Sequence, residues 1–124
     1  MAVSRRLRIL CAAFAAAALL GACGDKDDGP PTLRVDAVDI DYDRDTYEAA
    51  PGPTTLEFRN RGSLAHNIVF RAAPGAPVAS GIDEFLPAGA DATYDVDLVP
   101  GEYAFYCSVP GHEAAGMVGT LVVG

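Results

Sequence analysis

Turn-forming residues divide this chain into short segments, and their spacing constrains the fold more than any other feature. Groups rich in proline, glycine and asparagine recur at intervals of 9 to 14 residues: Pro51-Gly52-Pro53, Asn60-Arg61-Gly62, Pro74-Gly75, Pro87-Ala88-Gly89 and Pro100-Gly101. Proline and glycine favour turns because proline fixes φ and glycine tolerates positive φ. No sustained helical period lies between these groups. Such spacing predicts short strands and, in a domain of about a hundred residues, an antiparallel β-sandwich.

Apolar and polar residues alternate between the turns, as expected for strands with one buried face. The predicted strands cover Thr32–Asp41, Thr54–Asn60, His66–Arg71, Ala92–Leu98, Glu102–Cys107 and Val118–Val123. In the first strand the alternation changes phase near Ala37, which predicts a β-bulge. The sequence therefore predicts an all-β protein.

The first 22 residues have the composition of an export signal. A basic stretch, Ser4-Arg5-Arg6-Leu7-Arg8, precedes twelve apolar residues, Ile9–Leu20, too few to span a membrane. The segment ends in Leu20-Gly21-Ala22-Cys23, which resembles the lipobox of bacterial lipoproteins. We expect a signal peptide at 1–22, a lipidated Cys23 opening a flexible tether over 23–31, and one domain over 32–124. The alternative is an ordinary signal peptide followed by a chance cysteine. The resemblance implies anchoring to the bacterial cell membrane, facing the periplasm or cell exterior.

The mature chain is strongly acidic. The signal contains three of the nine basic residues and none of the 17 acidic ones, so its removal shifts the net charge from −8 to −11. An exported domain with this charge is not expected to bind nucleic acid and favours basic partners. Five aspartates within ten residues carry part of the charge: Asp36, Asp39, Asp41, Asp43 and Asp45. A solvated strand face is the favoured interpretation of them, and a docking patch is the alternative.

Soft metal donors are scarce in this chain and gather near its C-terminus. The only histidines are His66 and His112, and Met117 is the only methionine besides Met1. Cys11 leaves with the signal and Cys23 is expected to carry lipid, so Cys107 has no disulfide partner. An unpaired thiol in an exported protein is explained well by metal ligation. Two imidazoles, a thiolate and a weak axial thioether form the donor set of a blue-copper site.

The sequence around these donors resembles the cupredoxins of the plastocyanin/azurin group. The resemblance lies in Ala65-His66-Asn67, in the segment from Pro100 to Cys107, and in the spacing Cys107-x4-His112-x4-Met117. It runs from about Leu33 to Val123. It implies a Greek-key antiparallel β-sandwich of about seven to eight strands that binds one copper ion.

The resemblance also assigns roles to individual residues. His66, Cys107, His112 and Met117 become the metal ligands, and Asn67 becomes the residue that ties the two ligand segments together, with Ser108 as its partner. Such outer contacts help to set the redox potential. Ala65 stands where some members aim a backbone carbonyl at the metal. No catalytic residue is implied.

The implied function is transfer of single electrons between redox partners outside the cytoplasm, by a monomer. A basic cytochrome or a membrane oxidase domain would suit an acidic, tethered carrier. Copper storage or delivery with the same ligands is the alternative, and a sandwich without a metal role is a third. A Cys–His hydrolase is disfavoured because no oxyanion motif is present. Each donor alone has a simpler structural interpretation, such as a core histidine or a buried cysteine. For all four residues, however, these simpler interpretations would have to hold at once, at a spacing that matches a metal site.

Overall fold

The computed structural model describes residues 29–71 and 82–124, which contain eight strands and no helix. The strands are β1 (Thr32–Ala37), β2 (Thr46–Ala49), β3 (Gly52–Asn60), β4 (His66–Arg71), β5 (Ile82–Leu86), β6 (Asp91–Leu98), β7 (Gly101–Tyr106) and β8 (Val118–Val123). The predicted signal peptide at 1–22, Cys23, residues 24–28 of the tether and the turn at Pro74-Gly75 lie outside the described residues.

Residues 29–71 and 82–124 contain no helix long and apolar enough to cross a bilayer.

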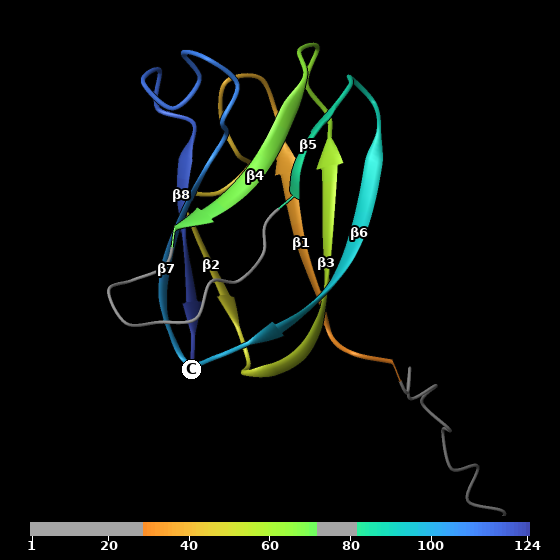
Figure 1. Ribbon diagram of the computed structural model, residues 1–124, viewed down its shortest axis with the longest axis vertical. Helices are drawn as coiled ribbons and strands as arrows, with labels where there is room; N and C mark the ends of the chain where they lie inside the picture. The colour runs from red at the N-terminus through yellow and green to blue at the C-terminus, as the bar shows by residue number, and fades with distance from the viewer. Residues whose placement is uncertain (1–28, 72–81) are drawn as a thin grey trace, which may run out of the picture.

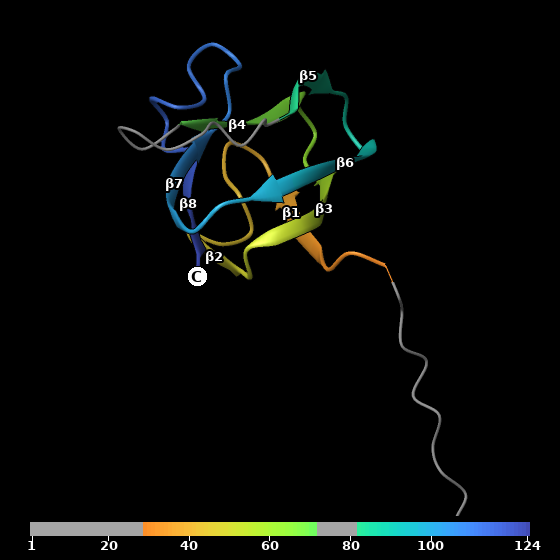
Figure 2. The ribbon, with the colours of Figure 1, turned by 60° about the horizontal axis from the view of Figure 1, so that its bottom comes forward.

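Two β-sheets face each other and enclose the core (Figures 1 and 2). One has the strand order β1-β3-β6 and the other β2-β8-β7-β4-β5. The predicted all-β sandwich and its number of strands are confirmed. Two pairs, β1–β3 and β2–β8, are nevertheless parallel, so both sheets are mixed. The reason is the path of the chain. It crosses to the other sheet after β1 and returns at β3, and such a crossover lets β1 and β3 run in the same direction.

The first predicted strand ends four residues early. β1 stops at Ala37 because Asp39 and Ile40 have positive φ angles of 79° and 48°, which strand geometry does not allow. A single bridge between Ala37 and Tyr42 closes the turn that replaces the expected bulge. The aspartates after Ala37 therefore lie in the connection between β1 and β2, and their interpretation as a strand face was wrong.

Two short strands were missed by the pattern of alternation. β2 has only four residues, and β5 has the burial pattern of a strand covered only at its two ends. Both lie at the edges of the five-stranded sheet. Edge strands are short and polar, so their sequences carry little hydrophobic periodicity.

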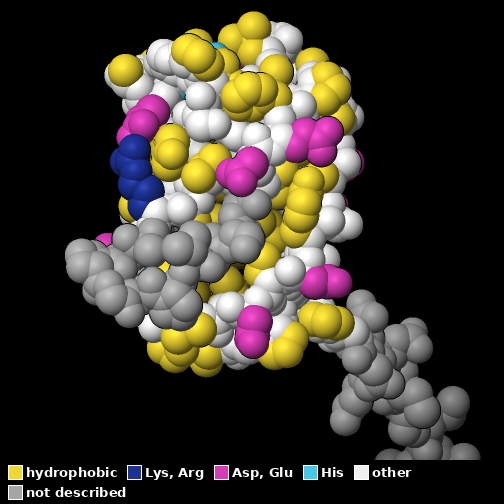
Figure 3. All heavy atoms as spheres, in the orientation of Figure 1, with side chains coloured by type: hydrophobic (Ala, Val, Ile, Leu, Met, Phe, Trp, Pro, Cys, Tyr) yellow, Lys and Arg dark blue, Asp and Glu magenta, His cyan; other side chains and the backbone are white. Residues whose placement is uncertain are grey.

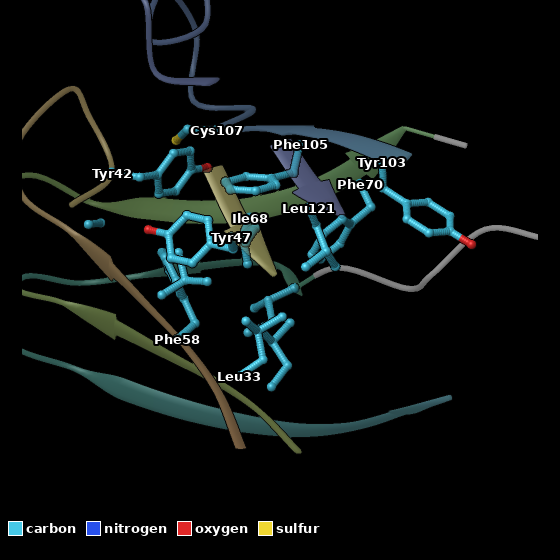
Figure 4. Packing of buried hydrophobic residues seen from close by; sticks show 14 of the residues in the cluster. Leu33, Tyr42, Tyr47, Phe58, Ile68, Phe70, Tyr103, Phe105, Cys107 and Leu121 are labelled. Carbon is cyan, nitrogen blue, oxygen red and sulfur yellow. The ribbon is translucent and has the colours of Figure 1, made fainter. Parts of the chain in front are cut away.

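An aromatic cluster around Phe105 fills the space between the sheets (Figure 4). The Phe105 ring centroid lies 4.9 Å from that of Tyr42, 5.6 Å from that of Tyr47 and 5.4 Å from that of Phe70. Tilted and edge-to-face contacts of this kind add to the free energy gained by burying the rings. Gly119 on β8 lies against the Phe105 ring, and a Cβ at this position would stand 2.3 Å from its Cζ.

We predict that Gly119→Ala lowers the free energy of unfolding by roughly 1–3 kcal/mol, because the added methyl group overpacks the core against Phe105. Denaturant titration of the metal-free protein measures the change. Gly124→Ala is the matched control, since nothing lies within 4 Å of its Cβ position. Equal stability of the two variants would contradict the prediction.

Candidate metal centre

Strand pairing brings the predicted donors to one end of the sandwich (Figure 1). β4 and β7 are antiparallel neighbours with Val69 opposite Tyr106. The first residue of β4, His66, therefore lies close to Cys107, which directly follows β7. The connection from Cys107 to Met117 holds His112 and leads back into β8. We call this connection, residues 107–117, the ligand loop.

Three of the donors converge on one point. Sγ of Cys107 lies 3.9 Å from Nδ1 of His66 and 3.6 Å from Nδ1 of His112, and the three candidate ligand atoms all lie within 4.8 Å of one another. A metal about 2.3 Å from a thiolate and about 2.0–2.1 Å from each imidazole, with angles near 120°, needs sulfur–nitrogen separations of about 3.8 Å. The observed separations lie on either side of this value. The cluster thus fits one ion in a trigonal set of two nitrogens and one sulfur.

The burial of the donors differs in a way that suits a shielded centre. His66, Cys107 and Met117 are completely buried, whereas His112 is partly exposed. Burial lowers the pKa of His66, an effect that the nearby His112 reinforces and a carboxylate beside the ring, that of Asp39, opposes. A lowered pKa keeps this imidazole neutral, and the neutral form is the one that binds metals.

Met117 is fixed to the other donors through its backbone. Its N–H donates to the carbonyl of His112 over 3.0 Å, and its carbonyl accepts the N–H of Cys107 over 3.1 Å. These two bonds close the ligand loop at its base. Its buried side chain belongs to the same core cluster as Cys107. The assignment of its thioether as an axial ligand stays a prediction.

The rest of the ligand loop folds on itself. The N–H of His112 donates to Val109 over 3.0 Å, and that of Ala115 donates to Gly111 over 3.0 Å. Gly111 and Gly116 adopt φ angles of 86° and 107°, which only glycine reaches at low cost. His112 is therefore held by a compact turn rather than by an extended loop.

Asn67 joins the two ligand-bearing segments. Its Nδ2 donates to Oγ of Ser108 and its Oδ1 accepts the N–H of Ser108, each over 2.8 Å. Nδ2 also donates to the carbonyl of Asp83 over 3.1 Å, where the register between β4 and β5 shifts. The structure thus places Asn67 and Ser108, the residues that directly follow His66 and Cys107, side by side.

A second buried asparagine was missed by the sequence analysis. Asn60 donates from Nδ2 to the carbonyls of Leu64 and Leu86, over 2.7 and 2.8 Å, and accepts the N–H of Gly62 at its Oδ1 over 3.0 Å. These bonds shape the turn that delivers His66. The sequence signalled only a turn here, because the distant partner Leu86 becomes visible only in the fold.

Comparison with known proteins agrees with this geometry. A family model described as copper binding proteins, plastocyanin/azurin family, matches residues 31–124. A plastocyanin minor isoform of Arabidopsis thaliana is 43% identical over 77 residues, which cover 55% of this chain and 42% of that protein. Plastocyanin of Synechococcus sp. (strain JA-2-3B'a(2-13)) is 32% identical over 94 residues, covering 71% and 67%. A further match, to plastocyanin of Chlamydomonas reinhardtii, covers 49% of that protein. The chain therefore spans about half the length of the Arabidopsis and Chlamydomonas proteins.

The fold has close counterparts among solved structures. Auracyanin from the photosynthetic bacterium Roseiflexus castenholzii, reduced with dithionite, superposes with a TM-score of 0.63 at 22% identity, covering 77% of this chain and 99% of that one. Sandwich and donor cluster together define a cupredoxin, a small β-protein with a buried mononuclear metal site. The chain belongs to the plastocyanin/azurin family of copper-binding proteins, and its His-Cys-His cluster identifies the cofactor as one copper ion.

We predict that Asn67→Ala lowers the free energy of unfolding by roughly 1–3 kcal/mol, because it removes the three hydrogen bonds that this buried side chain makes to Ser108 and to the Asp83 carbonyl. Chemical denaturation of the metal-free protein gives this quantity. Ser108→Ala removes only the hydroxyl partner and serves as the milder control. A loss no larger than that of the control would show that the bonds to the Ser108 N–H and the Asp83 carbonyl contribute nothing.

Proposed function

We propose that this protein is a type 1 copper protein that carries single electrons between redox partners. The observation that carries the proposal is the buried Cys107 thiol between two imidazoles, with only His112 reaching the surface. The ligands proposed are His66, Cys107 and His112, with Met117 as the axial sulfur donor. Copper, when bound, supplies a one-electron couple between Cu(I) and Cu(II) that thiolate, imidazole and thioether donors tolerate in both states.

The protein's own contribution is to hold these donors still and dry. The Asn67–Ser108 bonds and the Cys107–Met117 backbone bond fix the donor positions from both sides. Complete burial of His66, Cys107 and Met117 keeps bulk water from the centre. A site that does not rearrange exchanges electrons without moving its ligands, which suits a carrier better than a protein that must release its metal.

The surroundings of His112 suit brief docking of a redox partner. Pro110, Gly111, Ala114 and Ala115 are exposed around the imidazole. Figure 3 shows a small part of a histidine among hydrophobic side chains at this end of the molecule. Small, weakly polar contacts of this kind are typical of electron-transfer encounters. With its acidic charge, the carrier would favour a basic partner such as a basic cytochrome, or a membrane oxidase domain.

The proposed location is the outer side of the bacterial cell membrane, with a lipid on Cys23. The basic and apolar segments of residues 1–22 and the lipobox-like ending support it. Residues 29–31 enter β1 at the pole opposite the ligand loop (Figure 1). A tether at that pole would leave the His112 end free to meet partners.

We predict that the full chain, loaded with Cu(II) in detergent, shows an intense visible absorption band from thiolate-to-copper charge transfer. Cys107→Ser should abolish the band because it removes the thiolate, whereas Cys23→Ser, the matched control, should retain it. Visible absorption and electron paramagnetic resonance provide the measurement. A colourless Cu(II) protein, or a band that survives Cys107→Ser, would refute the proposal. Tight Cu(I) binding with transfer to an apo-acceptor, but no fast electron exchange, would instead support copper storage or delivery.

We further predict that Cys23→Ser moves the protein from the membrane fraction to the soluble exported fraction of a bacterial host. The reason is that its thiol is the proposed site of lipid attachment. Fractionation and labelling with a radioactive fatty acid measure this, with Cys11→Ser as the control that retains both label and location. Unchanged labelling of Cys23→Ser would rule out this anchor while leaving the copper chemistry untouched.

A further inference from the structure

The imidazole of His66 has one nitrogen whose role the copper site does not explain. Nδ1 faces Sγ of Cys107, whereas Nε2 points away from it. Within residues 29–71 and 82–124, Nε2 of His66 is the one buried side-chain nitrogen or oxygen without a hydrogen-bond partner. A neutral imidazole that binds a metal through Nδ1 carries its proton on Nε2. The buried nitrogen is then a donor that requires an acceptor.

A carboxylate stands beside this nitrogen. Oδ1 of Asp39 lies 3.6 Å from Nε2 of His66. The turn before His66 holds this carboxylate in place. Oδ1 accepts the N–H groups of Ser63 over 2.6 Å and Leu64 over 3.3 Å, and Oδ2 accepts the Ser63 hydroxyl over 3.0 Å. These bonds, led by the Ser63 N–H, lower the pKa of Asp39. The acceptor is therefore charged and fixed in place.

The backbone is strained where it delivers this carboxylate. Asp39 and Ile40 are the two non-glycine residues with positive φ in the part of the chain that the structure describes. A β-branched residue such as Ile40 is a true outlier in this region. The turn is held by the bridge to Tyr42 and by the Arg61 N–H, which donates to the Ala37 carbonyl over 2.8 Å. Strain of this kind persists only where the surrounding structure enforces it, and it gathers at functional sites.

Gly62 completes the arrangement by having no side chain. A Cβ at this position would stand 2.3 Å from Oδ1 of Asp39 and 3.0 Å from Nε2 of His66. Any other residue would therefore have to displace the carboxylate, the imidazole or both. The free space over Gly62 is what allows the two groups to approach.

We propose that Asp39 is a positioning residue of the copper centre, whose carboxylate accepts the Nε2–H of His66 when Nδ1 binds the metal. Nε2 of His66 and Oδ1 of Asp39 stand 3.6 Å apart, so a shift of a few tenths of an ångström completes this hydrogen bond. The bond fixes the ring and makes Nδ1 a stronger donor. The nearby negative charge also favours Cu(II) over Cu(I). This inference rests on the proposed assignment of His66 as a ligand.

The test compares Asp39→Asn with the wild-type full chain. Asparagine keeps an acceptor for the Ser63 and Leu64 N–H groups but removes the charge. We expect the reduction potential to rise, the affinity for Cu(II) to fall roughly 10- to 100-fold, and the His66 Nε2–H resonance of the diamagnetic Cu(I) protein to move upfield and exchange faster. Asp45→Asn is the matched control: Asp45 is an exposed carboxylate of the same connection with no described side-chain contact. It should leave all three unchanged.

Two further measurements keep the inference open to refutation if Asp39→Asn does not fold. Gly62→Ala retains the charge but separates the groups, so it should also raise the potential and weaken the Nε2–H signal. In the wild type, the His66 Nε2–H should be a slowly exchanging proton shifted downfield. The absence of this proton resonance from the wild type would overturn the inference. So would an Asp39→Asn protein with the same reduction potential, Cu(II) affinity and Nε2–H resonance as Asp45→Asn. Zn(II)-loaded protein gives the same resonance, so the result is independent of whether the copper form transfers electrons.

Discussion

The pairing of β4 with β7 is the interaction on which the metal centre depends. It places the first residue of one strand beside the residue that follows the other, and so brings His66 to Cys107 across 41 positions of sequence. The Asn67–Ser108 bonds extend this pairing beyond the last backbone partners. Because ligand separations must match a metal to within a few tenths of an ångström, this doubled connection matters more than any single contact of the loop.

The core and the site are one continuous structure. Tyr42, from the connection between β1 and β2, packs its ring on Phe105 and donates its hydroxyl to the carbonyl of Asn67 over 2.8 Å. In Figure 4, Cys107 lies at the end of the same aromatic cluster. Rigid packing of this kind resists displacement, since interiors are as dense as organic crystals. The sandwich thus acts as the frame that holds the donors, and the ligand loop only completes it.

The acidic stretch from Asp36 to Asp45, at the end of β1 and in the connection that follows it, is more than a solvated surface. Asp36 pairs with Arg59, Asp43 accepts the hydroxyl of Tyr47 over 2.6 Å, and Asp39 binds the turn before His66. The sequence showed five closely spaced aspartates and predicted one shared role for them. The partners of Asp36, Asp39 and Asp43 lie on other elements, so these three have separate roles that no local pattern contains. The charge still makes the molecule acidic, and it also ties this connection to neighbouring strands.

The sequence by itself determined the all-β class, six of the eight strands within residues 29–71 and 82–124, and the three residues of the His-Cys-His cluster, because periodicity, turn residues and the scarcity of histidine and cysteine are properties of the linear chain. Only the tertiary structure decided the parallel pairs, the two edge strands, the role of Asn60 and the approach of Asp39 to His66 over Gly62. These depend on contacts between residues distant in sequence and on backbone strain that the surrounding fold enforces. Spacing along a chain records which donors are available, whereas distances between strands decide how they are held.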